Sequence, residues 1–273
     1  MVLPAGRLEP INALDKHDMR LQDKVAFITG AAGGMGMQFC RAFLEEGARV
    51  LVTDMTAEMV DTAIAELNSP DSVIGAVVDV CKRSSIEAAV AKATDSFGRL
   101  DILVNVAGGA LHTPHKFNEI DEAAWDKVLD VNLKGTYLCS QVVVEQFRKQ
   151  GDGGKIVNIS ALAGRWLGSL AGCHYTAAKA GVIGLTRHLA YELGPEGIHV
   201  NAVAPTITLA SQRLIDLWES RTEEYKEKVV SQIPLRRLST PQEVAAGVIF
   251  LCTDEASYMT GVTLDINGGR FFS

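Results

Sequence analysis

Seven short runs of apolar residues recur along the chain, with little of the polar alternation expected of half-exposed strands. Continuous apolar runs of this length, rich in valine and isoleucine, are typical of strands buried on both faces of a parallel sheet. We therefore predict seven strands, spread over most of the chain. They lie at residues 25–28, 50–53, 73–78, 101–104, 156–159, 198–203 and 263–266.

Helical periodicity fills most of the intervals between these strands. Apolar residues recur at three- and four-residue steps after Gly36 and over residues 56–67, 84–97, 121–149 and 174–193. The polar segment 211–230 also has a helical pattern, and Thr240, Pro241 and Glu243 form the signature of a capped helix start. Strands alternating with helices predict an α/β fold, a single doubly wound Rossmann-type domain with a seven-stranded parallel sheet flanked by helices.

Composition limits the possible partners. The apolar fraction of 47% is ample for a core, and no apolar run suggests a membrane span. A net charge of −7 argues against nucleic acid and acidic membrane surfaces as partners. Residues 1–20 carry six charged side chains with no continuous apolar core and do not resemble a signal peptide, so we expect a flexible N-terminal arm there and the domain over residues 21–273.

The five cysteines are scattered along the chain, and no pair has C-x-x-C spacing. This pattern favours neither a disulfide framework nor a zinc site. We therefore expect no bound metal and a cytoplasmic location, where thiols stay reduced.

A glycine-rich turn follows the first predicted strand, with Gly30, Gly34 and Gly36 ahead of the first helix. Free N–H groups at such a helix start bind phosphate, and glycine lets a cofactor approach the backbone closely. The second strand ends in Asp54, about twenty residues later, where a carboxylate accepts from a ribose 2′-hydroxyl. The combination predicts NAD as the cofactor of the domain.

Tyr175 and Lys179 lie four residues apart on a predicted helix and therefore share one face. An ammonium fixed nearby favours the phenolate form of a tyrosine. Such a pair moves a proton to or from a carbinol oxygen while a nicotinamide exchanges hydride. Y-x-x-x-K is common by chance, but here it follows a nucleotide-binding pattern and a strand end, where ligands bind in sheets of this kind.

With these motifs the chain resembles the short-chain dehydrogenase/reductase family across nearly all of residues 21–269. The resemblance covers the glycine turn, the Asp79-Val80 pair, the Asn105-x-Ala107-Gly108 loop, and the Tyr175 and Lys179 pair. It implies catalytic roles for Asn132, Ser160, Tyr175 and Lys179, with Asn132 kinking a helix and holding a relay water. It also implies cofactor contacts from Gly30, Gly34, Met35, Gly36, Asp54, Asp79, Val80, Asn105, Ala107, Gly108, Tyr175, Lys179, Pro205, Ile207 and Thr208.

The family's usual serine after the fifth strand is missing from its expected place. Alignment of the strand puts Ala161 there, counting thirteen residues back from the tyrosine reaches Leu162, and the nearest serine is Ser160. A regular strand would leave Ala161 facing the substrate. Because the following loop is one or two residues longer than usual, we expect a bulge that turns Ser160 into the site.

The motifs predict an NAD-dependent oxidoreductase that interconverts a secondary alcohol and a ketone. Pro205-Thr206, where the family usually has Pro-Gly, resembles some polyol and sugar-alcohol members. Two alternatives stay open: a 3-oxoacyl thioester reductase, and a nucleotide-binding regulator that has lost turnover. The resemblance also implies a homotetramer of D2 symmetry, built on the helices at 121–149 and 174–193 and on the C-terminal segment. His112, His115, His174, Trp166 and Trp218 are weaker candidates for the substrate pocket.

Overall fold

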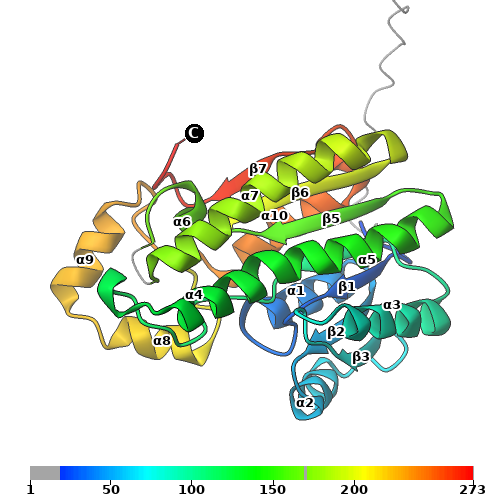
Figure 1. Ribbon diagram of the computed structural model, residues 1–273, viewed down its shortest axis with the longest axis horizontal. Coiled ribbons are helices and arrows are strands. Elements are labelled where there is room, and N and C mark those ends of the chain that lie inside the picture. Colours follow the sequence, from blue (N-terminus) through cyan, green and yellow to red (C-terminus); the bar gives the residue numbers. More distant parts are fainter. Residues whose placement is uncertain (1–18, 169–170, 273) are drawn as a thin grey trace, which may run out of the picture.

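The computed structural model describes residues 19–168 and 171–272, with one sheet as the middle layer between helices (Figure 1). The arm expected over residues 1–20 lies outside this part of the chain except for Met19 and Arg20. The backbone N–H and the guanidinium of Arg20 both donate to the Glu46 carboxylate. Leu21 is already fully buried, so packed structure is in place at this point of the sequence.

All seven predicted strands are present and parallel. Their order is β3-β2-β1-β4-β5-β6-β7, so the chain builds one half of the sheet on each side of β1. In doubly wound sheets, ligands bind where the strand order reverses, outside the carboxyl ends of the strands. The strands are β1 (Val25–Ile28), β2 (Arg49–Asp54), β3 (Val73–Val77), β4 (Ile102–Asn105), β5 (Gly154–Ile159), β6 (Ile198–Pro205) and β7 (Thr263–Ile266).

The helices fall between the strands as predicted, and the capping box of Thr240 and Glu243 is formed. The polar segment 211–230 is helical, as expected, and forms two helices, α8 and α9. The helices are α1 (Gly34–Glu45), α2 (Ala57–Leu67), α3 (Arg83–Phe97), α4 (Glu122–Leu129), α5 (Gly135–Gln150), α6 (Leu162–Arg165), α7 (Cys173–Leu193), α8 (Gln212–Glu219), α9 (Glu223–Ser231) and α10 (Pro241–Cys252).

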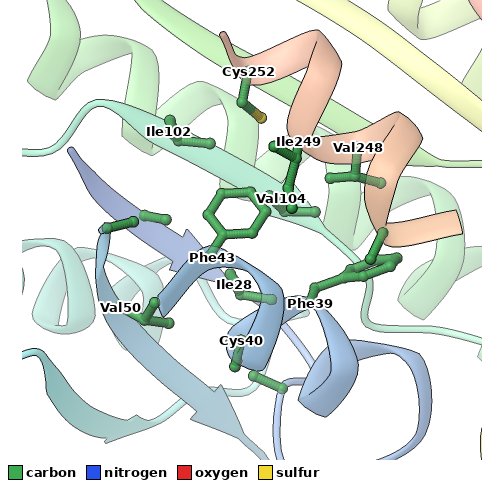
Figure 2. Close-up of a cluster of buried hydrophobic side chains, with 14 of the residues drawn as sticks. Ile28, Phe39, Cys40, Phe43, Val50, Ile102, Val104, Val248, Ile249 and Cys252 are labelled. Atoms are coloured by element: carbon green, nitrogen blue, oxygen red, sulfur yellow. The ribbon is translucent and has the colours of Figure 1, made fainter. Parts of the chain in front are cut away.

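Each face of the sheet has its own apolar core, because successive strand residues point to opposite faces. Phe27 belongs to the cluster formed with α3, α5 and α7. Its neighbour Ile28 belongs to the cluster formed with α1 and α10. Figure 2 shows that second cluster, in which Phe39 and Phe43 of α1 meet Ile249 of α10 above the strands. The central strands β1 and β4 are buried on both faces and show no polar alternation, as the sequence predicts.

The helix predicted over residues 121–149 is interrupted. Its first part is α4, its second part is α5, and a π-helical turn, η2 (Asp130–Lys134), joins them. The buried Asn132 side chain lies in this turn and donates to the Val128 carbonyl at 2.9 Å. A π-turn changes the direction of a helix locally and is frequent at functional sites. The kink expected at Asn132 is therefore present.

Candidate active site

A cavity of about 930 Å³ opens at the carboxyl ends of the strands. Its walls come from the loops after β1, β2, β4, β5 and β6, together with the start of α7 and one side of α8. A volume of this size suits a cofactor or a drug-sized ligand. The cavity thus lies at the edge of the sheet where the sequence motifs converge.

The glycine turn forms one end of the cavity, and the backbone there leaves no room for side chains. Gly30 has φ of +60°, and a Cβ placed on it would lie 2.8 Å from the Ala107 Cα. A Cβ on Gly36 would lie 2.2 Å from the Gly30 carbonyl oxygen. The helix α1 begins here with no side-chain cap, and Gly34, Met35 and Gly36 line the cavity. These features leave the first amides of α1 for an anion.

Asp54 lines the same end of the cavity and is held by the backbone. Its Oδ2 accepts from the Ala32 N–H at 3.1 Å, and its Oδ1 accepts from the Met55 N–H at 2.8 Å. Each carboxylate oxygen keeps a further lone pair. The carboxylate is thus fixed in place while it retains the capacity to accept from a hydroxyl group.

Two other predicted cofactor residues point elsewhere. The Asp79 carboxylate accepts from the Cys81 N–H at 3.0 Å and pairs with Lys82, and Asp79 does not line the cavity although Val80 does. The buried Asn105 side chain donates to the Asn158 Oδ1 at 2.8 Å inside the sheet–helix interface. The Asn105 side chain therefore joins β4 to β5 and does not line the cavity, and its expected cofactor contact remains a prediction.

Asn132 ties the π-turn to the loop after β4. Its Oδ1 accepts from the Gly109 N–H, and its Nδ2 donates to the Gly109 carbonyl, both at 2.9 Å. A Cβ on Gly108 would lie 2.4 Å from the Asn132 Oδ1 and 3.5 Å from the Lys179 Nζ. The side chains of Asn132 and Lys179 therefore both pack against Gly108, and of these three residues Gly108 and Lys179 line the cavity.

Tyr175 and Lys179 lie one turn apart on α7, and both line the cavity. The Lys179 Nζ lies 5.7 Å from the centre of the Tyr175 ring and donates to the Ile159 carbonyl at 2.7 Å. The strand end thus fixes the ammonium beside the phenol ring. The structure thus brings the predicted pair together on one face of α7, beside the cavity.

Burial decides the protonation of this pair. It raises the pKa of Tyr175 to about 12, although part of the ring is open to the cavity, and it lowers the pKa of Lys179 to about 8. The expected stabilisation of the phenolate by Lys179 therefore does not prevail in the free protein. The physical reason is that the cavity floor disfavours both charged forms.

The lowered Lys179 pKa predicts a pH-dependent stability. Between pH 8 and 10.5 the unfolded chain binds more protons at this group than the folded chain, so the free energy of unfolding rises with pH. Relative to Lys179→Met, the wild type should gain on the order of 3 kcal/mol between pH 7.5 and 10.5. Urea unfolding of both proteins across this range measures the difference. Parallel pH curves for the two proteins would contradict the prediction.

The end of β5 is regular, and the expected bulge at Ser160 is absent. The Ser160 N–H donates to the Val203 carbonyl at 2.9 Å and so continues the ladder between β5 and β6. The Ser160 hydroxyl is buried and donates to the Lys179 carbonyl at 2.9 Å. Ser160 thus joins β5 to α7, and Ala161, with extended backbone, occupies the cavity wall beside it. Ser160 also lines the cavity, and the catalytic role expected for its hydroxyl remains a prediction.

The comparisons with known proteins identify the family of the chain. A family model described as "Enoyl-(Acyl carrier protein) reductase" matches residues 30–270. The chain belongs to the short-chain dehydrogenase/reductase family. It is 39% identical to the Thauera aromatica (2S)-[(R)-hydroxy(phenyl)methyl]succinyl-CoA dehydrogenase subunit BbsD, over 92% of this chain and 98% of that protein.

Another relative is the NAD-dependent glycerol dehydrogenase of Listeria innocua, 37% identical over 92% of this chain and 95% of that protein. A Brucella melitensis crystal structure titled short-chain dehydrogenase/reductase and glucose/ribitol dehydrogenase superposes with a TM-score of 0.83. That chain is 30% identical, and the match covers 93% of this chain and 99% of the other. The fold and the oxidoreductase class of this short-chain dehydrogenase/reductase are therefore established.

Short-chain dehydrogenases/reductases use NAD or NADP, and the cavity fits such a dinucleotide. The glycine turn leaves a cradle that a Cβ would fill, and the Asp54 carboxylate is pre-positioned at the same end. After β6, Pro205, Ile207 and Thr208 line the cavity as expected. The Thr206 hydroxyl lies beside them, buried and without a hydrogen-bond partner.

The sequence reading missed other parts of this dehydrogenase/reductase site. Arg213, Leu214 and Leu217 of α8 line the cavity. Their i, i+1, i+4 spacing is the signal that would have marked one helix face. His112 and His115 also line it, whereas neither Trp166 nor Trp218 is among the lining residues.

Among residues 19–168 and 171–272, no three His, Cys, Asp or Glu side chains gather in a way that could hold a metal ion. Within the same residues, none of the helices is both long and apolar enough to cross a bilayer.

Proposed function

We propose that the protein is an NAD-dependent oxidoreductase that interconverts a secondary alcohol, of polyol or sugar type, and the corresponding ketone. The observation that carries this proposal is the cavity itself. It has the Asp54 carboxylate at one end and the Tyr175 and Lys179 pair at the other. The NAD-dependent glycerol dehydrogenase and the structure with a glucose/ribitol title, both reported above, support the substrate class.

In this proposal Tyr175 transfers the proton, because its phenol lies in the cavity beside the Lys179 ammonium. Lys179 is held by the Ile159 carbonyl and stabilises negative charge that develops on the phenol oxygen. Asn132 fixes the loop after β4 and is the anchor of a relay water. NAD, when bound, supplies the hydride chemistry.

The pKa of Tyr175 determines the pH at which each direction of the reaction is favoured. With a pKa of about 12, Tyr175 is protonated at neutral pH and is ready to donate to a ketone oxygen. Alcohol oxidation requires the phenolate, whose fraction grows tenfold per pH unit below the pKa. Oxidation is therefore favoured by alkaline conditions and reduction by neutral ones.

Asp54 predicts a preference for NAD over NADP of tenfold or more in kcat/KM. Its carboxylate accepts from the 2′-hydroxyl of NAD but repels a 2′-phosphate, and no lysine or arginine occurs between Arg49 and Lys82 in the sequence to offset the charge. Tenfold corresponds to about 1.4 kcal/mol. Steady-state kinetics with both cofactors measure the ratio, and Asp54→Asn should reduce it. Equal kcat/KM for NAD and NADP in the wild type would contradict the assignment.

The substrate class is tested with a panel of polyols, sugars, hydroxysteroids, aryl alcohols and hydroxy acids, each supplied with NAD and followed by NADH absorbance. We expect turnover of polyols or sugar alcohols above the rest. Absence of NADH formation with every alcohol, and of NADH consumption with the matching ketones, would favour the nucleotide-binding regulator.

Reduction of 3-oxoacyl thioesters is the second candidate. The matching family model carries the name of an acyl carrier protein reductase, and the Thauera relative is named for a CoA thioester. Arg213 lines the cavity and has no ion-pair or hydrogen-bond partner among the described residues. A 3-oxoacyl thioester assayed with NADH and with NADPH separates the two candidates, because the thioester reductase favours NADPH.

We further infer a homotetramer in the cytoplasm. Large side chains are exposed on the helices expected at the interfaces, with Tyr137 of α5 at 42% and Tyr191 of α7 at 87% exposure. Tyr258, shortly before β7, is also fully exposed. Five free cysteines agree with a reducing compartment. Sedimentation at micromolar concentration tests the assembly.

A further inference from the structure

The turn at residues 110–113, in the loop after β4, has an unusual backbone. Its two central residues, Leu111 and His112, have φ of 52° and 59°. Residues other than glycine rarely adopt this left-handed conformation, and such strain persists only where the surroundings impose it. The Thr113 N–H closes the turn by donating to the Ala110 carbonyl at 3.0 Å. Leu111 and His112 both line the cavity, as Tyr175 does.

A fully buried histidine holds this turn against the catalytic helix. The His174 Nδ1 accepts from the Tyr175 N–H at 3.0 Å, so the ring hydrogen is on Nε2. Nε2 lies 2.7 Å from the Thr113 hydroxyl oxygen and donates to it. The Thr113 hydroxyl then donates to the Ala110 carbonyl at 2.6 Å. One chain of hydrogen bonds thus runs from the backbone of Tyr175 to the turn.

The neighbouring residues fix the imidazole in this orientation. A Cβ on Gly172 would lie 2.8 Å from the His174 Cε1, so the backbone packs directly against the ring. On the other side of the turn, the Lys127 Nζ donates to the Leu111 carbonyl at 3.2 Å. The His174 ring therefore has no space to rotate toward Gly172. The turn is also hydrogen-bonded to α4 through Lys127.

We propose that His174 and Thr113 are positioning residues that clamp the strained turn 110–113 to the start of α7. The clamp sets the distance between Tyr175 and the cavity wall formed by Leu111 and His112, and therefore the fit of the alcohol or ketone. This role rests on the proposed function. It lies away from the glycine turn and Asp54, so it acts on substrate binding and not on cofactor binding.

The matched pair Thr113→Val and Thr113→Ser tests the clamp. Valine has the volume of threonine but leaves the buried Nε2–H without an acceptor, whereas serine keeps the hydroxyl. We expect Thr113→Val to raise KM for the alcohol about tenfold, with the NADH Kd from fluorescence titration within twofold of the wild type. Thr113→Ser should stay within twofold of the wild type in both. An equal rise in KM in Thr113→Ser would overturn the proposal. So would a change in the NADH Kd of Thr113→Val as large as the change in its KM.

Two measurements on the free protein do not depend on turnover. In imidazole ¹H–¹⁵N spectra, His174 should show a slowly exchanging Nε2 hydrogen in the wild type and in Thr113→Ser but not in Thr113→Val. A His174→Asn variant assigns the signal. Hydrogen exchange of residues 108–113 should accelerate in Thr113→Val alone. If no alcohol or ketone reacts with the wild type, the proposed function fails while these measurements still decide the clamp. Unchanged exchange in Thr113→Val would refute it.

Discussion

Replacing Tyr175 with phenylalanine should lower kcat for alcohol oxidation by a factor on the order of 10³. The substitution removes the hydroxyl that moves the proton but keeps the ring that lies 5.7 Å from the Lys179 Nζ. Since the glycine turn and Asp54 are untouched, the NADH Kd should stay within twofold of the wild type. Stopped-flow or steady-state NADH absorbance gives kcat, and fluorescence titration gives the Kd.

The pH profile separates a chemical role of Tyr175 from a packing role. With the Tyr175 pKa raised to about 12, wild-type oxidation should accelerate with pH through the neutral and mildly alkaline range. The residual rate of Tyr175→Phe should lose this dependence. Tyr191→Phe is the matched control, because Tyr191 lies on the same helix and is not among the residues that line the cavity. Full activity in Tyr175→Phe, or an equal loss in Tyr191→Phe, would remove Tyr175 from the mechanism.

The sheet was predictable because buried parallel strands leave a direct trace in sequence. Each central strand must be apolar on both faces, and the helices between them must repeat at helical spacing. The break between α4 and α5 leaves no such trace. Leu129 and Leu133, at i and i+4, fit one helical stripe whether or not a π-turn joins them, and only the resemblance at Asn132 indicated the kink.

The backbone of the glycine turn was easier to predict than the direction of the Asn105 side chain. The glycine turn and Asp54 follow from backbone requirements that leave little freedom, since Gly36 has no space for a Cβ. The side chain of Asn105, by contrast, depends on which face of the sheet it points to at the strand end. It pairs with Asn158 on the neighbouring strand, a contact between residues 53 positions apart that periodicity does not reveal.

The clamp of His174 and Thr113 escaped the sequence reading for a related reason. The two residues lie 61 positions apart, and each belongs to a loop or helix start with no regular pattern. Histidine next to the catalytic tyrosine was visible in the sequence, but its partner was not. Contacts of this kind depend on the exact course of a loop, and the left-handed Leu111 and His112 are not suggested by their residue types.

At the end of β5, a difference of one residue decides whether Ser160 or Ala161 presents its side chain to the substrate. Alternation of side chains along β5 allowed two outcomes, Ala161 facing the site or a bulge that turned Ser160 toward it. The ladder continues without interruption to the Ser160 N–H. The hydroxyl therefore donates to the Lys179 carbonyl, and the next residue along the cavity wall is Ala161, which has no hydroxyl.

Ser160→Ala is accordingly a control and not a catalytic knockout. It should lower the midpoint of thermal unfolding, because a buried carbonyl loses a donor, and it should change kcat by less than about threefold. A loss of kcat on the order of 10² with unchanged thermal stability would instead show that Ser160 takes part in the reaction. It would also mean that the active enzyme does not have the regular strand end at Ser160.

Ala161→Ser should raise kcat by a factor on the order of 10 to 10². Ala161 lines the cavity one residue beyond Ser160, on extended backbone with φ of −165°, so a serine fits there without strain. A hydroxyl that donates to the carbonyl oxygen stabilises charge developing there, and one such donor is worth about 2–4 kcal/mol in the transition state when well aligned. The gain should appear in kcat with little change in NADH Kd, and it should persist in the Ser160→Ala/Ala161→Ser double variant, because the two hydroxyls act on different partners. An unchanged kcat in Ala161→Ser would mean that Tyr175 and Lys179 already supply all the stabilisation that this cavity offers the oxygen.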